Sequence, residues 1–82
     1  MDITRATEVT QEVNDTVTDI FTYHAWTEEQ KAAGERVRDV LANAFRAIIA
    51  NVPSSPDRSA ALRKIREARM DANSAITHNG KY

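Results

Sequence analysis

Val52-Pro53-Ser54-Ser55-Pro56-Asp57 holds both prolines of the chain and separates two long segments with helical spacing. Ser55 suits the N-cap of a following helix, and Pro56 suits the first helical position, where no amide is needed. Asp57 places a negative charge at the positive end of the helix dipole. The stretch therefore predicts a turn over residues 53–56 and a helix that begins at residue 56.

The segments on both sides of this turn carry apolar residues three and four positions apart, as in a helix with one buried face. Upstream, the capping box Thr27-Glu28-Glu29-Gln30 predicts a helix over residues 27–52. Downstream, Asn79-Gly80 offers a left-handed residue that closes a helix over residues 56–79. The spaced apolar residues are Val37, Leu41, Ala44, Ile48 and Val52 upstream, and Leu62, Ile65, Ala68, Ala72 and Ile76 downstream.

Residues 1–26 form a leading segment with helical spacing at Val9, Val13 and Val17, although its many threonines also allow a strand. We predict a helix in this segment. The 82 residues are thus expected to form one all-α domain, residues 1–82, in which a short N-terminal helix precedes a long antiparallel two-helix hairpin. Because two helices alone bury little surface, we expect several hairpins to assemble into a helical oligomer.

The composition argues against several classes of protein. Hydrophobic residues make up 41% and charged residues 28%, which is typical of a folded domain, and the lack of cysteine excludes disulfides and thiolate metal sites. The net charge of -1 gives no attraction to DNA, so no DNA partner is expected. Neither a secretory signal nor a long apolar run is seen, so we expect a cytoplasmic protein without a membrane partner.

The residue pattern predicts neither catalysis nor a metal site. A hydrolytic site needs a nucleophile with a base, or a carboxylate pair in a pocket, but the carboxylates here sit mainly at helix starts and on polar faces. His24 and His78 lie at opposite ends of the sequence, without the spacing of a metal site. We therefore expect no enzyme, no metal and no cofactor.

Four ring-bearing residues fall within six positions at the start of the first long helix: Phe21, Tyr23, His24 and Trp26. One interpretation is a hydrophobic staple that directs the chain into the helix. The other is a platform on which a purine stacks. The second long helix is basic in its centre, either as a solvated face with ion pairs or as an anion-binding surface: Arg58, Arg63, Lys64, Arg66 and Arg69.

Taken in order, these residues resemble the hairpin-domain family of bacteriophage sponge proteins, the anti-CBASS and anti-Thoeris proteins that capture signalling nucleotides of bacterial immunity. The resemblance covers about residues 21–79 and needs no insertion. It rests on Phe21-x-Tyr23-His24, Val37-Arg38, Pro53-x-x-x-x-Arg58 and Ala61-Leu62-x-x-Ile65-x-Glu67-Ala68-x-Met70-x-Ala72-Asn73-x-Ala75-Ile76.

The resemblance implies a homo-oligomer, commonly a hexamer, in the cytoplasm of the infected bacterial host. Such a sponge serves immune evasion: it binds a cyclic dinucleotide, a cyclic oligonucleotide or a related cyclic ADP-ribose signal without cleaving it. In the family, the tyrosine of the aromatic motif stacks on a base, and a basic residue early in the long helix contacts the ligand from a neighbouring subunit. These roles fall on Tyr23 and Arg38, and His24 and Asn79 are expected beside the pocket.

The chain departs from the family at Ala25-Trp26, where members often carry prolines, and at Asp71, where members often place a tryptophan. Two other classes of function stay open. The same apolar faces could build a helical scaffold or protein-interaction module with no nucleotide ligand. A helical nucleic-acid-binding regulator is disfavoured by the net charge of -1 and by the lack of a recognisable reading helix.

Overall fold

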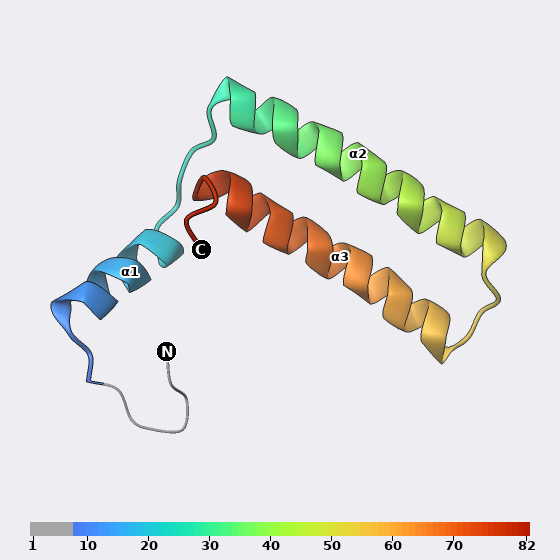
Figure 1. Ribbon diagram of the computed structural model, residues 1–82. Helices are drawn as coiled ribbons and strands as arrows, with labels where there is room; N and C mark the ends of the chain where they lie inside the picture. Colours follow the sequence, from blue (N-terminus) through green and yellow to red (C-terminus); the bar gives the residue numbers. More distant parts are fainter. Residues whose placement is uncertain (1–7) are drawn as a thin grey trace.

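The computed structural model describes residues 8–82, which form three helices and no strand. Helix α1 spans Gln11–Phe21, α2 spans Glu28–Asn51 and α3 spans Pro56–Thr77. Helices α2 and α3 lie side by side as an antiparallel hairpin, and α1 lies beyond the end of the hairpin at which α2 begins and α3 ends (Figure 1). The all-helical prediction is confirmed, including a helix in the leading segment, of which residues 1–7 lie outside the described residues.

Side-chain caps explain where each helix begins. The hydroxyl of Thr10 accepts from the Val13 amide at 3.2 Å, and the Ser55 hydroxyl accepts from the Arg58 amide at 3.2 Å. The predicted capping box is present at α2, because Thr27 and Gln30 each accept from the other's amide, at 3.1 and 2.9 Å. These bonds satisfy amides that have no partner within the first turn of a helix.

The end of α3 differs from the prediction by two residues, since the helix ends at Thr77 and not at residue 79. Asn79 and Gly80 take left-handed φ angles of 52° and 74°. Their amides turn back to the carbonyl oxygens of Ile76 and Ala75, at 3.2 and 2.9 Å, in the pattern of a Schellman motif. The two residues therefore close the helix from outside it.

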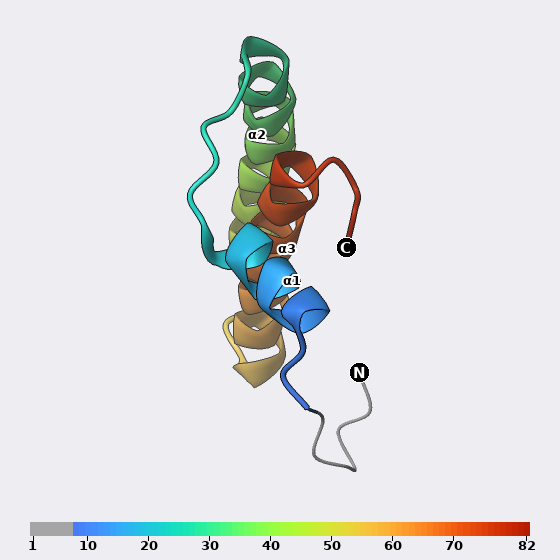
Figure 2. The same cartoon turned by 90° about the vertical axis from the view of Figure 1, so that its left-hand side faces the viewer.

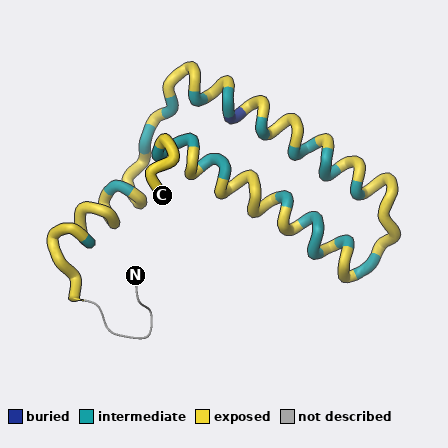
Figure 3. The backbone as a smooth tube through the Cα atoms, viewed as in Figure 1, coloured by how far each residue is buried: buried dark blue, intermediate teal, exposed yellow. Residues whose placement is uncertain are grey.

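The hairpin is held together by half-buried side chains that face each other along α2 and α3, yet none of the described hydrophobic residues is fully buried. Gly34 is the one buried residue among residues 8–82 (Figure 3). Val52 and Ala68, two of the predicted apolar face, are exposed. The predicted positions that are half-buried are Val37, Leu41, Ala44, Ile48, Leu62, Ile65, Ala72 and Ile76.

Much apolar surface of this two-helix layer remains exposed. Val40 on α2 is 67% exposed and Met70 on α3 is 70% exposed. Helix α1 makes no helix-to-helix contact within the described range, and Figure 2, viewed from the left-hand side of Figure 1, shows it in front of the hairpin. None of the described helices is both long and apolar enough to cross a membrane.

Candidate binding site

The linker of residues 22–27 brings the predicted aromatic motif to the end of the hairpin where α2 begins and α3 ends (Figure 1). Trp26 anchors this linker to both helices. Its indole Nε1 donates to the Thr77 hydroxyl at 2.7 Å, and a Cβ added at Gly34 would overlap the indole ring. Nearby, the Gln30 amide nitrogen donates to the Ile76 carbonyl at 2.9 Å. The anchoring proposed for the aromatic motif therefore lies with Trp26.

Tyr23 has different surroundings from Trp26. Its side chain is 87% exposed and lines a hollow, here called the junction hollow, together with His24, Trp26, Lys31 and Thr77. A ring with that exposure contributes little to holding the linker in place. Its position beside an anchored tryptophan and a lysine leaves an aromatic face accessible to a ligand.

His24 is turned toward α1 and the end of α3. Its Nε2 lies 2.7 Å from the backbone carbonyl of Asp19, so the tautomer protonated at Nε2 donates a hydrogen bond there. The same atom lies 3.6 Å from the Asp19 carboxylate. The ring meets that of His78 edge-on, with 5.2 Å between centroids.

The Asp19 carboxylate collects contacts from the C-terminal residues. The Tyr82 hydroxyl donates to it at 2.6 Å and the Lys81 ammonium at 3.3 Å, while Nδ1 of His78 lies 3.7 Å away. The hydrogen bonds from Tyr82 and Lys81 lower the pKa of Asp19 below its ordinary value. The bond to Asp19 in turn raises the pKa of Tyr82, and it also raises the pKa of Lys81.

His24 and His78 lie close together in the structure although they are far apart in the sequence, so their separation along the chain does not argue against a shared metal site. One ligand atom from each of Asp19, His24 and His78 falls within 4.8 Å of the others. We call these three residues the histidine cluster. It forms because the antiparallel hairpin brings the end of α3 next to the linker that leads into α2. The spacing of residues within one segment does not predict which distant segments lie side by side.

Arg38 lies on α2, outside the junction hollow. It is 55% exposed, pairs with Asp39 at 3.5 Å, and lines a second hollow that shares Trp26 and Lys31 with the first. Tyr23 and Arg38 are thus not brought into one hollow of the same chain. A ligand held by both needs to span the two hollows or to lie between two copies of the chain.

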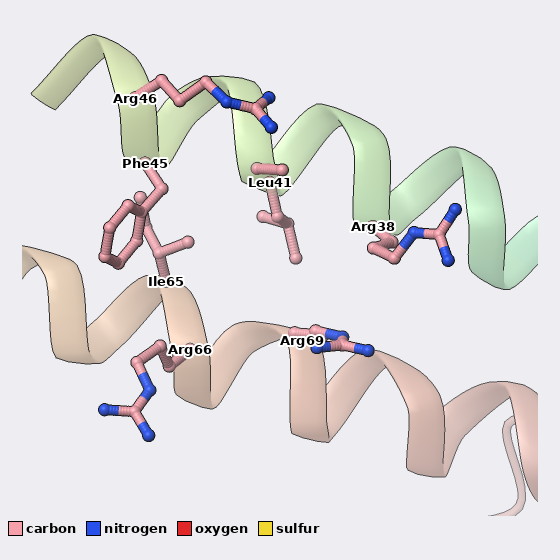
Figure 4. A pocket seen from close by; sticks show the side chains of 8 residues that line it. Arg38, Leu41, Phe45, Arg46, Ile65, Arg66 and Arg69 are labelled. Atoms are coloured by element: carbon pink, nitrogen blue, oxygen red, sulfur yellow. The ribbon is translucent and has the colours of Figure 1, made fainter.

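A cationic groove continues from Arg38 along the hairpin and was not predicted from the sequence as one site. Its centre is apolar, and arginines from both helices lie around it (Figure 4). We call it the arginine groove; its lining includes Arg38, Leu41, Phe45 and Arg46 of α2 and Ile65, Arg66 and Arg69 of α3. Its signal in the sequence was the basic centre of α3, but the share contributed by α2 depends on how the hairpin pairs.

Asn79, the fourth predicted site residue, is exposed and has a clear backbone role. Its left-handed conformation, with φ at 52°, is one that asparagine adopts more readily than most residues. It is not among the residues that line the junction hollow. The predicted ligand contact at Asn79 stays a prediction.

No family model matches the chain, and neither a curated protein nor a solved structure shows significant similarity to it.

Proposed function

We propose that this protein is a phage-type nucleotide sponge, a homo-oligomer that binds a cyclic dinucleotide or a related cyclic nucleotide signal and releases it unchanged. The observation that carries the proposal is the 87% exposure of Tyr23 on a linker that Trp26 holds in place. A nucleobase stacked on such a ring gains about 1–3 kcal/mol. Holding the linker beforehand lowers the entropy lost on binding.

Cations near Tyr23 support an anionic ligand despite the net charge of -1. Lys31 lines the junction hollow itself, and Arg38 and Arg69 line the hollow beside it. A guanidinium presents paired donors that match a phosphate or the edge of a base. These side chains are suited to the phosphates of a cyclic nucleotide whose base stacks on Tyr23.

The exposed apolar surface of the hairpin supports assembly of several copies. A chain without a fully buried hydrophobic residue in its described range gains most of its stabilising burial by packing against other chains. Assembly also offers a way for Arg38 of one copy to reach the Tyr23 pocket of another. Six copies is the number common in the family that the sequence resembles.

A thermal-shift panel tests the proposal. Cyclic dinucleotides, cyclic trinucleotides and cyclic ADP-ribose isomers are added to the protein, because any tight ligand of the folded state raises the melting temperature. We expect at least one of them to raise it and to be recovered intact after the complex is heated. A panel without any shift, or a product that accumulates with time, would contradict the proposal.

A helical scaffold without a nucleotide ligand is the second candidate, favoured by exposed apolar residues such as Val40 and Met70. It predicts a stable oligomer whose melting temperature does not respond to any member of the panel. It also predicts that replacing Tyr23 has no effect on the response to any of these nucleotides.

A further inference from the structure

We infer that Asp19, His24 and His78 form a binding site for a divalent transition-metal ion, for which Zn²⁺ has the most suitable chemistry. The three side chains come from the last turn of α1, the linker and the residue that caps α3. Two imidazole nitrogens and one carboxylate oxygen are a donor set that zinc prefers, and three protein ligands leave a fourth position for water. This inference does not depend on the proposed nucleotide ligand.

The distances are close to those that a tetrahedral ion requires. Ligand atoms about 2.0–2.1 Å from zinc lie about 3.3 Å from one another. Oδ1 of Asp19 lies 3.6 Å from Nε2 of His24, and the other carboxylate oxygen, Oδ2, lies 3.7 Å from Nδ1 of His78. With one ligand atom taken from each residue, the three atoms all lie within 4.8 Å of one another. Small side-chain rotations are enough to bring them around one ion.

Metal binding requires a change in the tautomer of His24 and the loss of one hydrogen bond. Without a metal, Nε2 of His24 lies in hydrogen-bond contact with the backbone carbonyl of Asp19 at 2.7 Å. Binding requires the proton to be on Nδ1, so that the lone pair of Nε2 faces the ion. The exchange keeps the imidazole neutral and replaces one hydrogen bond by a coordination bond.

Surrounding groups hold two of the ligands in place. The Tyr82 hydroxyl donates to Asp19 at 2.6 Å, as outer partners of metal ligands commonly do. The His78 side chain is only 8% exposed and lies edge-on to both His24 and Tyr82, at 5.2 and 5.1 Å between centroids. Its orientation is thereby restricted before any ion binds.

Lys81 opposes the ion and therefore provides a sharp test. Its ammonium lies 3.3 Å from the Asp19 carboxylate, but the side chain is 63% exposed and can turn into solvent. If Asp19 only forms ion pairs, removing the Lys81 charge takes one of them away. If the cluster binds a divalent cation, removing the charge lowers the electrostatic repulsion of that cation. Lys81→Met is thus expected to bind the metal more tightly than the unaltered chain.

The metal would link α1 to the hairpin. Helix α1 has no helix-to-helix contact within residues 8–82, so its placement depends on the linker and on contacts of Asp19 such as those with Tyr82 and Lys81. An ion bound by residues of α1, the linker and the end of α3 would hold these three segments together. A rise in protection of the α1 amides from hydrogen exchange is the expected sign.

The experiment is calorimetric titration of the untagged full chain with ZnCl₂, together with visible absorption of the CoCl₂ complex. We expect one ion per chain and the visible bands of four-coordinate cobalt. The affinity should fall about tenfold or more in each of the variants Asp19→Asn, His24→Gln and His78→Gln. It should not fall in Glu12→Gln, which changes an exposed acid of α1, the helix that carries Asp19.

Circular dichroism of each variant checks that the hairpin is intact. We expect it to be, because none of the three residues of the cluster lies within α2 or α3. His24→Gln carries the test if His78→Gln perturbs the end of α3. Failure of the folded, unaltered chain to bind zinc, or zinc affinity that is the same in His24→Gln, would overturn the inference. Weaker binding in Lys81→Met would also contradict it.

Discussion

Neighbouring aromatic side chains of the linker region have different surroundings and therefore different roles. Trp26 is half-buried against Gly34 and donates a hydrogen bond to Thr77, whereas Tyr23 and Phe21 are 87% and 82% exposed. Gly34 costs helix stability of roughly 1 kcal/mol relative to alanine, which is offset by the close approach of the indole ring. The same comparison identifies Phe21 as a matched control for Tyr23.

Gly34→Ala should destabilise the protein, although alanine is the better helix former. The added methyl group would overlap the indole ring of Trp26, and overpacking of this kind costs about 1–3 kcal/mol. Urea denaturation measures the effect. In a Trp26→Ala background the clash is absent, so the same substitution should be neutral or slightly stabilising; a loss of equal size in both backgrounds would contradict this packing.

Tyr82 should ionise at a higher pH than an ordinary tyrosine, because its hydroxyl donates to the Asp19 carboxylate, which raises its pKa. A spectrophotometric titration in a Tyr23→Phe background reports on Tyr82 alone. Adding Asp19→Asn should return the midpoint toward about 10. An unchanged midpoint would mean that the hydrogen bond does not persist in solution.

These pKa shifts make the free energy of unfolding depend on pH. A folded-state pKa of Tyr82 above the unfolded value gives a contribution that is complete below about pH 10 and is lost as the pH rises through the folded value. The lowered pKa of Asp19 gives a contribution that is present above about pH 4 and is lost as the pH falls through its folded value.

Local signals in the sequence were enough to predict three helices and to place the starts of α2 and α3. Ser55 and the capping box at Thr27 act on amides within one turn, so the sequence alone is enough to locate the starts of α2 and α3. The histidine cluster and the arginine groove depend on which segments lie side by side, and no spacing within one segment shows that. Gly34 was a usable signal for the packing of α2, since a glycine inside a predicted helix often marks a place where another part of the chain packs closely against it.

Substitutions at Asn79 separate its backbone role from the predicted ligand contact. Asn79→Gly keeps the left-handed turn that closes α3, so its melting temperature should match that of the unaltered protein. Asn79→Ala should lower the melting temperature, because the left-handed region costs about 1–2 kcal/mol for most residues. If Asn79 also contacts the nucleotide, Asn79→Gly should weaken binding without a loss of stability; equal affinities would remove Asn79 from the site.

The hairpin as a whole is a single layer of two helices that leaves part of its apolar surface exposed. Side chains such as Val40, Ile49 and Met70 are 67%, 43% and 70% exposed in one copy. Packing several copies against these residues is the most direct way to bury them. The proposed pocket depends on this assembly if Arg38 of one copy is to meet Tyr23 of another.

Light scattering should therefore give a mass several times the 9.2 kDa of one chain at micromolar concentration. Introducing a charge into the apolar surface, as in Val40→Asp or Met70→Asp, should lower this mass if that residue lies in the interface. Glu67→Gln, an exposed polar change on α3, is the control. A mass of one chain for the unaltered protein would contradict the shared pocket.

Calorimetric titration of Tyr23→Ala with the nucleotide that gives the largest thermal shift tests the sponge proposal most directly. Loss of the stacked ring should cost about 1–3 kcal/mol of binding, while Tyr23→Phe and Tyr23→Trp keep much of the affinity. Phe21→Ala, which removes the ring of a similarly exposed residue outside the junction hollow, should bind like the unaltered protein. A folded, oligomeric Tyr23→Ala protein with unchanged affinity would contradict stacking on Tyr23.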